Sequence, residues 1–578
     1  AQAAIYGTIG SNGVILITTK SGSRNQEAVV DYQAYYGIQQ TSRQLDLLNG
    51  EEYALLLNEA YVNAGQQSPI SEALGEIGEG TDWQDEVFAM APMMSHNLSV
   101  RGGTDKTSYS LSGSILNQDG IVGEEKSQFS RRTAALTLES DVKEKLNVST
   151  RLFYYSTQNN SLNDFGLGSV LFNALNMAPT IDASVENLQG EIDLGNEVIN
   201  PIPQIRNTFN DSRTNRLSGT AQLKYDYANN LDLQVRMGFN TAFTQNRDFI
   251  PMFDYGPGKV FNRVDENLVS QGKINDNDYT FDIFNTYKNR FGDRHAVTFV
   301  AGMTVFRQFG EGLLGTSTGV PSNDIQFADI GTATGAGENL SASSYAYDVR
   351  RLSYFGRLKY TLNEKYLFSG ILRRDASTRF GPNNRVGYFP SFTAGWVFSD
   401  EPFFPEWRAL DFMKVRGGYG IMGNDRIPDF LYLALLTGQA TYVSGVDNGL
   451  INGIAVGPLA NPNVQWEESK KANIGTDVRL FGNKVNLAVD YYRDVTANLL
   501  IANLPISGIF GVSAPGASGP TLNAGTVRNQ GFEIELSYSD TWGSELGVNM
   551  SANFTSINNE VTEINGGDFL EGGQFGVG

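Results

Sequence analysis

Apolar and polar residues alternate with a period of two through most of the chain. From Leu231 to Phe239 every odd position is apolar, whereas Asp232, Gln234 and Arg236 lie between them. The same alternation recurs in 108–115, 217–226 and 483–493. A period of two is typical of a β-strand with one apolar face. We expect about seventeen such strands, most about ten residues long, which is the length that crosses a bilayer when tilted.

Short turns and long connections alternate between these strands. The short turns are 102–106, 143–145, 228–230, 292–294, 363–365, 481–484 and 540–544. The long connections are 157–214, 244–279, 308–347, 421–465 and 496–526. A β-sandwich has short turns at both ends, and a β-helix repeats at a fixed period. Short turns at one end and long loops at the other predict an all-β fold, a transmembrane antiparallel β-barrel.

Aromatic residues and one helical segment add detail to this barrel. Tyrosines gather toward strand ends at 35–36, 154–155, 225–227 and 491–492, which favours interfacial girdles over ordinary β-propensity of aromatic residues. Residues 49–61 contain good helix formers, with acidic residues near the start. We therefore expect a short helix in the first long connection.

The N-terminal part of the chain does not alternate in this way. Four consecutive apolar residues, Val14 to Ile17, follow an Asn-Gly turn. Such a run indicates a strand buried on both faces. It directly precedes the first expected barrel strand, Val29 to Gly37, and a wide barrel has an open channel unless something plugs it. The run therefore predicts the last strand of a plug inside the lumen, with 21–26 as a polar hinge.

Composition excludes several function classes. The net charge of −20 argues against a nucleic-acid partner. The chain has no cysteine, so it has no disulfide, thiol nucleophile or cysteine-ligated metal. His96 and His295 are the only histidines, and we expect both to be packed or solvent-facing. No run approaches the roughly 20 apolar residues of a membrane helix.

Acidic residues offer two further candidates for chemistry. Asp82, Asp85 and Glu86 cluster, but a solvated or helix-capping role is favoured over a glycosidase carboxylate pair. Asp276 and Asp278 resemble a calcium loop that lacks its glycine and terminal glutamate, so no metal site is predicted. A soluble glycan hydrolase is disfavoured because no convincing acid/base pair is present and because the apolar faces point outward.

Ordered motifs along the chain resemble one family. Residues 4–7 (AIYG) and 11–22 (SNGVILITTKSG) look like the end of the plug in SusC/RagA-type TonB-dependent outer-membrane transporters. Similar blocks follow at 82–88, 95–104, 117–122, 373–381, 387–396, 461–475 and 527–533. The plug–barrel signature comprises Tyr6, Gly7, Asn12, Gly13, Val14, Ile15, Thr18, Thr19 and Lys20. Arg373, Asp375 and Arg379 occupy the R-x-D-x-S-x-R-F-G stretch and either line the lumen as a charged ladder or form a structural network at the wall.

The resemblance implies a fold and a domain organisation. Family barrels have about 22 strands behind a plug. By this comparison 1–24 is the C-terminal end of a plug domain, and 25–578 is a partial outer-membrane barrel with long extracellular loops. We expect the remaining plug and the closing strands to lie outside this chain. Because an open barrel exposes strand edges, we expect the chain alone to aggregate in detergent.

The resemblance also implies a function. Family members carry out TonB-dependent import of oligomeric nutrients, mainly glycans and sometimes peptides, across the bacterial outer membrane. The implied partners are a TonB-type energy-coupling protein, a SusD-like surface lipoprotein, an oligosaccharide or peptide substrate and the lipid bilayer. No catalytic residue and no cofactor is implied. A passive porin or a surface adhesin barrel is the alternative.

Overall fold

The computed structural model describes residues 5–564 of the chain. Within that range it leaves out 6, 9, 12, 18, 72, 163–165, 167, 189–197, 257–261, 336–339, 405–406, 437, 445–448, 503, 505–508, 510–517 and 544. Seventeen of the strands form one sheet, and two small hairpins stand apart from it.

The strands of the large sheet are long and follow one another in chain order. They are β1 (Gln26–Gln39), β2 (Ala91–Gly103), β3 (Thr107–Gly120), β4 (Glu124–Lys143), β5 (Leu146–Asn160), β6 (Phe209–Ala228), β7 (Leu231–Ile250), β10 (Leu268–Phe291), β11 (His295–Thr318), β12 (Ser341–Leu362), β13 (Tyr366–Ser377), β14 (Val386–Val397), β15 (Leu410–Asn424), β18 (Glu467–Leu480), β19 (Val485–Ile501), β20 (Leu522–Trp542) and β21 (Leu546–Ile564).

The remaining elements lie in the connections. They are α1 (Gly50–Asn63), α2 (Leu74–Ile77), α3 (Trp83–Val87), α4 (Val170–Asn176), α5 (Pro201–Arg206), β8 (Phe253–Asp254), β9 (Arg263–Val264), η2 (Ile325–Phe327), η3 (Ile330–Thr332), η5 (Phe398–Asp400), β16 (Gly438–Ser444) and β17 (Gly449–Ala455). No helix among the described residues is long and apolar enough to cross a membrane.

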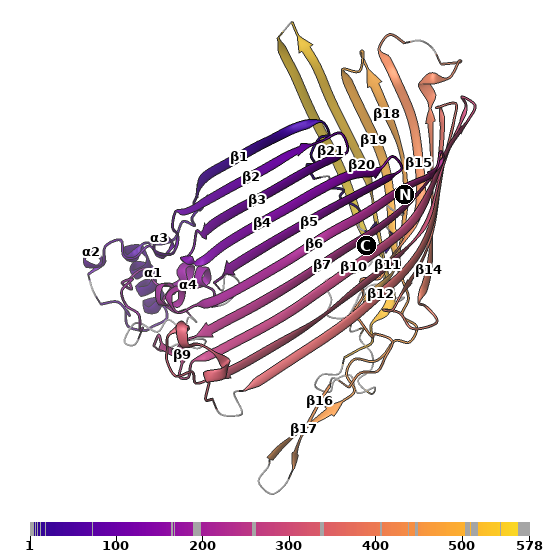
Figure 1. Cartoon of the computed structure of the whole chain (residues 1–578). Helices are drawn as coiled ribbons and strands as arrows, with labels where there is room; N and C mark the ends of the chain where they lie inside the picture. The colour runs from indigo at the N-terminus through magenta and orange to yellow at the C-terminus, as the bar shows by residue number, and fades with distance from the viewer. Residues whose placement is uncertain are drawn as a thin grey trace.

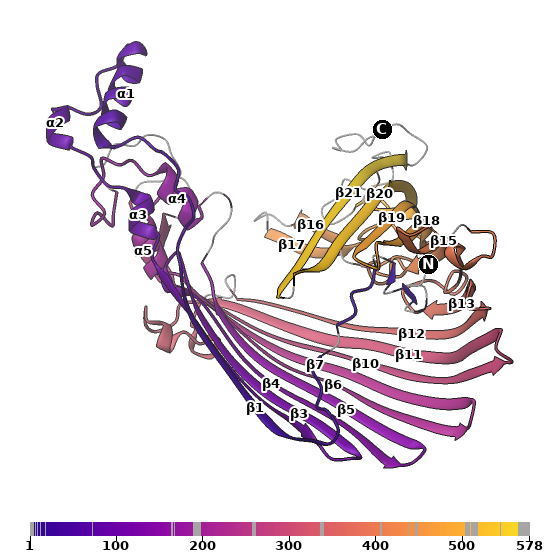
Figure 2. The same ribbon diagram turned by 90° about the horizontal axis from the view of Figure 1, so that it is seen from above.

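Each strand of the large sheet pairs antiparallel with the next, from β1–β2 through β7–β10 and β15–β18 to β20–β21. Among the described residues β1 pairs with β2 alone and β21 with β20 alone. The sheet therefore forms an open arc, which Figure 1 shows from its convex side and Figure 2 from above. The count of seventeen strands and the antiparallel meander confirm the barrel prediction.

The predicted alternation of turns and loops is also confirmed. Hairpins β2–β3, β4–β5, β6–β7, β10–β11, β12–β13, β18–β19 and β20–β21 close at the seven predicted turns. Several of these turns contain residues with positive φ, among them Asn363, Glu364 and Gly292. The helices and small hairpins all lie in connections at the other ends of the strands, except η5, which follows β14.

The strands are longer than the sequence pattern predicts. β10 and β11 have 24 residues each, and β6 and β7 have 20. At about 3.3 Å per residue, a 24-residue strand spans roughly 80 Å, well beyond a bilayer. Much of the predicted loops 244–279 and 308–347 is therefore strand. Asp276 and Asp278 lie inside β10 and not in a loop.

The two faces of the sheet differ in chemistry. On the convex face of β6, Leu217, Leu223, Tyr225 and Tyr227 are each about two-fifths exposed. Tyr225 and Tyr227 lie beside the periplasmic-type turn that follows β6, as an interfacial girdle requires. On the concave face charged residues pair across strands, for example Arg236 with Asp282 at 2.7 Å. The concave face is the lumen wall.

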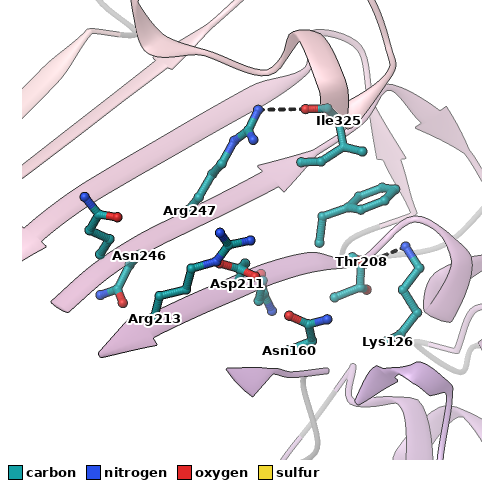
Figure 3. Close-up of a pocket in the computed structure, with 11 residues that line it drawn as sticks. Lys126, Asn160, Thr208, Asp211, Arg213, Asn246, Arg247 and Ile325 are labelled. Atoms are coloured by element: carbon teal, nitrogen blue, oxygen red, sulfur yellow. Dashed lines mark hydrogen bonds and ion pairs between the residues drawn. The ribbon is translucent and has the colours of Figure 1, made fainter. Parts of the chain in front are cut away.

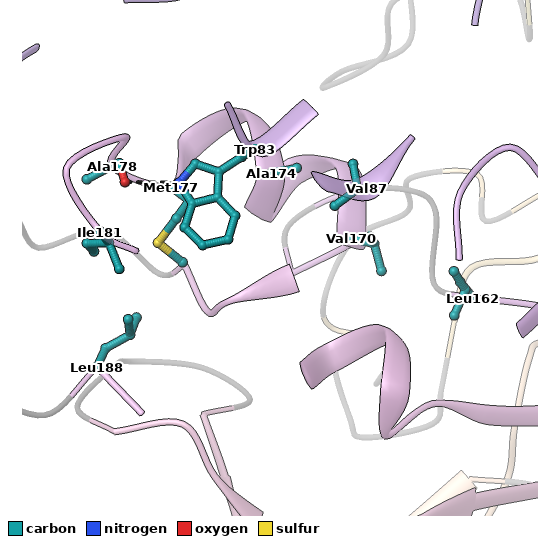
Figure 4. Packing of buried hydrophobic residues seen from close by; sticks show 9 residues of the cluster. All are labelled: Trp83, Val87, Leu162, Val170, Ala174, Met177, Ala178, Ile181 and Leu188. Carbon is teal, nitrogen blue, oxygen red and sulfur yellow. Dashed lines mark hydrogen bonds between the residues drawn. The ribbon is translucent and has the colours of Figure 1, made fainter. Parts of the chain in front are cut away.

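A small apolar cluster holds the helices together above the sheet (Figure 4). Trp83 of α3 is 3% exposed and donates its indole N–H to the carbonyl of Ala178 at 3.0 Å. The cluster also contains Val87, Leu162, Val170, Ala174, Met177, Ile181 and Leu188. We call α1–α5 and this cluster the helical cap. The predicted helix 49–61 is α1, which begins after Asn49 in a reciprocal capping box with Glu52.

Candidate functional site at the lumen wall

The first described residues of the chain lie against the lumen wall (Figure 2). We call Ile5, Gly7, Thr8, Gly10 and Ser11 the docking segment. Ile5 packs on Ile371 of β13 and Met422 of β15, both buried. Thr8 is 1% exposed and Ser11 is 4% exposed. The segment is therefore in close contact with the wall although it is far from it in sequence.

Arg373 is the principal contact of the docking segment. Its Nε donates to both carboxylate oxygens of Asp375, at 2.8 and 3.0 Å. Its Nη1 donates to the backbone carbonyl of Ile5 at 2.9 Å. Arg373 is 5% exposed and Asp375 is fully buried. Asp375 therefore neutralises and orients the guanidinium, whose other end binds the segment.

Arg351 of β12 makes the second contact. Its Nη1 donates to the hydroxyl of Thr8. Its Nε lies 3.3 Å from a carboxylate oxygen of Asp425, and both side chains are nearly buried. Its guanidinium also lies 4.9 Å from the centre of the Phe306 ring. Arg351 thus repeats the arrangement of Arg373, with an aspartate on one side and the docking segment on the other.

Arg379 has a different role, because its side chain contacts the connection that follows β15. It donates to Asp429 at 2.9 Å and to the backbone carbonyl of Asp425 at 3.0 Å. It therefore fixes the connection after β15, which in turn supplies the partner of Arg351. We call the three arginines and Asp375, Asp425 and Asp429 the ionic network.

The ionic network balances three positive with three negative charges. Removing one member of a buried pair leaves its partner uncompensated, which costs about 3–5 kcal/mol. Two alternatives were open from sequence, a lumen-lining ladder and a structural network at the wall. Arg373 and Asp375 contact each other, and Arg373 also contacts the docking segment, whereas Arg379 contacts the connection after β15; both alternatives stay predictions.

Gly7 is at the tightest point of the docking segment. Its φ is +66°, a conformation that residues with a Cβ rarely adopt. A Cβ at this position would overlap the guanidinium of Arg373. Gly13 also has a positive φ, of +99°, but a Cβ there would meet nothing within 4 Å. Of these two glycines, only Gly7 therefore packs against a member of the ionic network, Arg373.

A second anchor lies at the start of β1. Arg24 forms an ion pair with Asp141 and lies 3.7 Å from Glu139, and its hydrogen bond to Asp141 raises the pKa of Arg24. The backbone N–H of Asn25 donates to Thr104 at 3.0 Å. The predicted hinge 21–26 is thus tied to turns of neighbouring hairpins. The residues between the two anchors cross the concave side of the sheet (Figure 2).

The predicted doubly buried strand over 13–20 is not observed. The described residues 13–17, 19 and 20 form no strand. Ile15, Leu16 and Ile17 are 91%, 76% and 81% exposed. The burial prediction is wrong for this chain because no described strand lies beside the run to complete a ladder. Of the signature residues, Thr19 and Lys20 are exposed too, whereas Tyr6, Asn12 and Thr18 lie outside the described residues.

The other sequence candidates have structural roles. Asp82 is the N-cap of α3, and Asp85 accepts a hydrogen bond from Gln44 at 2.8 Å. His96 and His295 each bond a tyrosine hydroxyl, that of Tyr32 and of Tyr360. No group of three or more potential metal ligands occurs in the part of the chain that the structure describes.

Three members of the network were not identified from sequence. They are Arg351, Asp425 and Asp429, whose partners lie 46–343 residues away along the chain. Arg351 follows Arg350 in β12, and the two point to opposite faces of the strand. The alternation of β12 would place Arg351 on the lumen side, but nothing local indicates its partners.

Comparisons with known proteins agree with this geometry. The family model "TonB dependent receptor-like, beta-barrel" matches residues 145–576. The chain is 27% identical over 596 residues to TonB-dependent receptor SusC of Bacteroides thetaiotaomicron, covering 98% of this chain and 56% of that protein. It is 26% identical over 577 residues to TonB-dependent receptor P3 of Formosa agariphila, covering 98% and 54%. The chain thus spans about half the length of these curated relatives.

Solved structures show the same fold. The structure of the RagAB peptide transporter has a TM-score of 0.82 and 20% identity, covering 97% of this chain and 64% of the other. The curated relatives are named as receptors, which agrees with the expectation that the chain is not an enzyme. The chain belongs to the TonB-dependent receptor-like β-barrel family, whose barrels lie in the bacterial outer membrane.

Proposed function

We propose that the chain is the wall and the last plug segment of a transporter that imports oligomeric nutrients across the outer membrane. The cargo is a glycan or a peptide, and import is driven through a TonB-type energy-coupling protein. The docking of Ile5 and Thr8 on the buried ionic network carries this proposal. A passive porin has no need for a segment bound by buried charges inside its lumen.

The proposed domain boundary follows from the same contacts. Residues 1–24 are the C-terminal end of the plug, and β1 begins the wall at Gln26. The two anchors, at Arg373 and at Arg24, would hold this end of the plug against opposite parts of the wall. The apolar run 14–17 would then pair with further plug strands.

The helical cap suggests where a partner sits. It lies at the ends of the strands opposite the short turns, which is the extracellular side of an outer-membrane barrel (Figure 1). A SusD-like surface lipoprotein placed over these connections would close the lumen from outside. RagAB, a peptide transporter by its name, and SusC are the similar proteins that make such a partner a reasonable proposal.

Uptake into whole cells tests the proposal. Cells that make the protein are given fluorescent oligosaccharides or oligopeptides, with and without a protonophore that abolishes energy coupling. We expect uptake of one cargo class to stop with the protonophore. Uptake that continues unchanged would instead support the passive porin.

A variant pair links transport to the ionic network. Asp375→Ala leaves Arg373 uncompensated, so we expect leakage of small solutes into protonophore-treated cells. Asp282→Ala is the matched control, because it breaks an ion pair with Arg236 on the same lumen wall without touching the docking segment. Equal leakage from both variants would show that the ionic network does not hold the plug.

A further inference from the structure

A pocket of about 370 Å³ lies at the extracellular ends of β4–β7 and is not part of the lumen site (Figure 3). Lys126, Arg213 and Arg247 contribute to its lining, together with one acidic residue, Asp211, and several amides. A loop residue, Ile325, covers one side. The pocket thus combines strand and loop residues.

Strand alternation places the pocket on the convex face. On β7, Arg247 shares a face with Met237 and Phe243, which are 52% and 37% exposed. On β6, Arg213 shares a face with the exposed Leu217. The wall therefore separates the pocket from the lumen, so that a transported cargo does not pass it.

The height of the pocket relative to the apolar band is also fixed by the strands. Arg213 lies opposite Gln245, which follows Phe243 by two residues on the same face. Two residues of strand span about 7 Å. The pocket therefore lies beyond the apolar residues of the convex face, toward the extracellular ends of the strands.

The charged side chains of the pocket are held in place by the protein. The Lys126 ammonium lies 3.1 Å from the carbonyl oxygen of Thr208 and 3.4 Å from the centre of the Phe209 ring. Arg247 donates to the carbonyl of Ile325 at 2.7 Å. Arg213 bonds Asp211 through its Nε at 3.0 Å.

Donors nevertheless remain for a ligand. The Lys126 ammonium has three N–H groups, and the Arg213 side chain is 58% exposed. Three cations against one carboxylate give the pocket a local excess of positive charge in a chain of net charge −20. A preorganised cationic pocket of this kind suits an anionic group with several acceptor oxygens.

We propose that this pocket binds a phosphate group of a phosphorylated glycolipid in the outer leaflet. Lys126 and Arg213 contact the phosphate oxygens, and the amide of Gln245, on the same face as Arg213, contacts a neighbouring sugar hydroxyl. Position favours a lipid, because the pocket opens on the convex side of the wall, beyond the apolar residues that would face the bilayer. The binding is independent of transport, since it uses the opposite face of the wall.

The test measures retention of lipid by the whole protein purified from outer membranes. The probes are diphosphorylated lipid A, the same lipid without phosphate, and inorganic phosphate as competitor. We expect the protein to bind the phosphorylated lipid at least tenfold more tightly than the dephosphorylated lipid. Lys126→Gln with Arg213→Gln should weaken that binding about 10- to 30-fold, since each basic residue near an anionic surface contributes roughly tenfold or less.

Two further variants make the test decisive. Arg213→Lys keeps the charge and should retain most of the binding. Lys224→Gln removes one cation from the lumen face of the same strand, where it pairs with Asp226, and should change nothing. The proposal would be overturned by equal binding of the two lipids or by an equal loss of binding in the Lys224→Gln protein. Complete displacement of the lipid by millimolar inorganic phosphate would also overturn it, because the pocket would then be a site for free phosphate.

Discussion

Replacing Gly7 by alanine should release the docking segment from the lumen wall. The added Cβ forces a positive φ on a residue that disfavours it, which costs about 1–2 kcal/mol. It also overlaps the Arg373 guanidinium, which must then move away from Asp375. Weakening a charged hydrogen bond costs about 1.5–3 kcal/mol. The two effects together destabilise docking by about 2.5–5 kcal/mol.

Gly13→Ala is the matched control for this substitution. It also puts a residue with a Cβ at a positive φ, of +99°, but the new Cβ meets no atom within 4 Å. Its effect on docking should therefore stay within about 1–2 kcal/mol. The difference of about 1.5–3 kcal/mol between the two variants corresponds to roughly 10- to 150-fold in the undocked population.

Cysteine labelling measures that population. The chain contains no cysteine, so a single Ser11→Cys substitution provides the sole reactive thiol of this sequence. Ser11 is 4% exposed when docked, so maleimide reacts in proportion to the undocked fraction. We expect Gly7→Ala to accelerate labelling at least about tenfold relative to Gly13→Ala. Equal rates would refute the idea that contact between Gly7 and Arg373 holds the segment.

A double variant separates contact from general disruption. If the overlap with Arg373 causes the release, Arg373→Ala should remove most of the extra effect of Gly7→Ala. Additive effects of the two substitutions would show that Gly7 acts without Arg373.

Three further predictions concern the helical cap and the periplasmic edge. Trp83→Ala should cost about 3–5 kcal/mol of local stability, and Trp83→Phe should cost less. Limited proteolysis of whole cells should therefore cut the extracellular connections faster in the alanine variant than in the phenylalanine variant. Asn49→Ala removes the N-cap of α1 and should cost about 1 kcal/mol, measured as faster amide exchange in its first turn. Hydrogen bonds from Trp396 and Tyr366 lower the pKa of Glu401. The stability that they contribute is therefore fully present above the ordinary glutamate pKa and is lost as the pH falls through the lowered pKa. Acid titration of tryptophan fluorescence should show this transition, and Glu401→Gln should remove it.

The strand count and the hairpins were predictable because lipid imposes a local signal. Every second residue of a spanning strand must be apolar, and the chain reverses at one end through short turns. Turn residues such as Asn363 are visible in the sequence for the same local reason. The α1 helix was likewise marked by its own capping residues.

The strand lengths were not predictable from the same signal. Above the membrane both faces of β10 meet water or other protein, so the alternation of apolar residues disappears while the backbone ladder continues. For this reason the sequence pattern predicts a loop over residues 268–278, although these residues pair in register with both β7 and β11. Hydrogen bonding to neighbouring strands, which sequence does not reveal, sets the length.

The ionic network was predictable only in part. Arg373, Asp375 and Arg379 were marked by a motif, but their partners are not local. The bond from Arg373 to Ile5 joins residues 368 positions apart. The run 14–17 failed for a related reason, because burial of a strand depends on neighbours that its own residues do not specify.

If the docking segment is the end of a plug, as proposed, the composition of the contact explains how it can be held firmly and still be removed. Among the described residues of the docking segment, Ile5 makes apolar contact with the wall, whereas Thr8 and the backbone of Ile5 bind through hydrogen bonds to two arginines. Each arginine also has an aspartate beside it that does not belong to the segment, Asp375 or Asp425. When the segment leaves, the charges therefore remain paired, and water in the lumen replaces the lost hydrogen bonds at a small net cost. A segment bound instead by a large apolar surface would expose that surface on release and resist return. A pulling force thus needs to overcome a few directional bonds, and the wall keeps its shape for the segment to dock again.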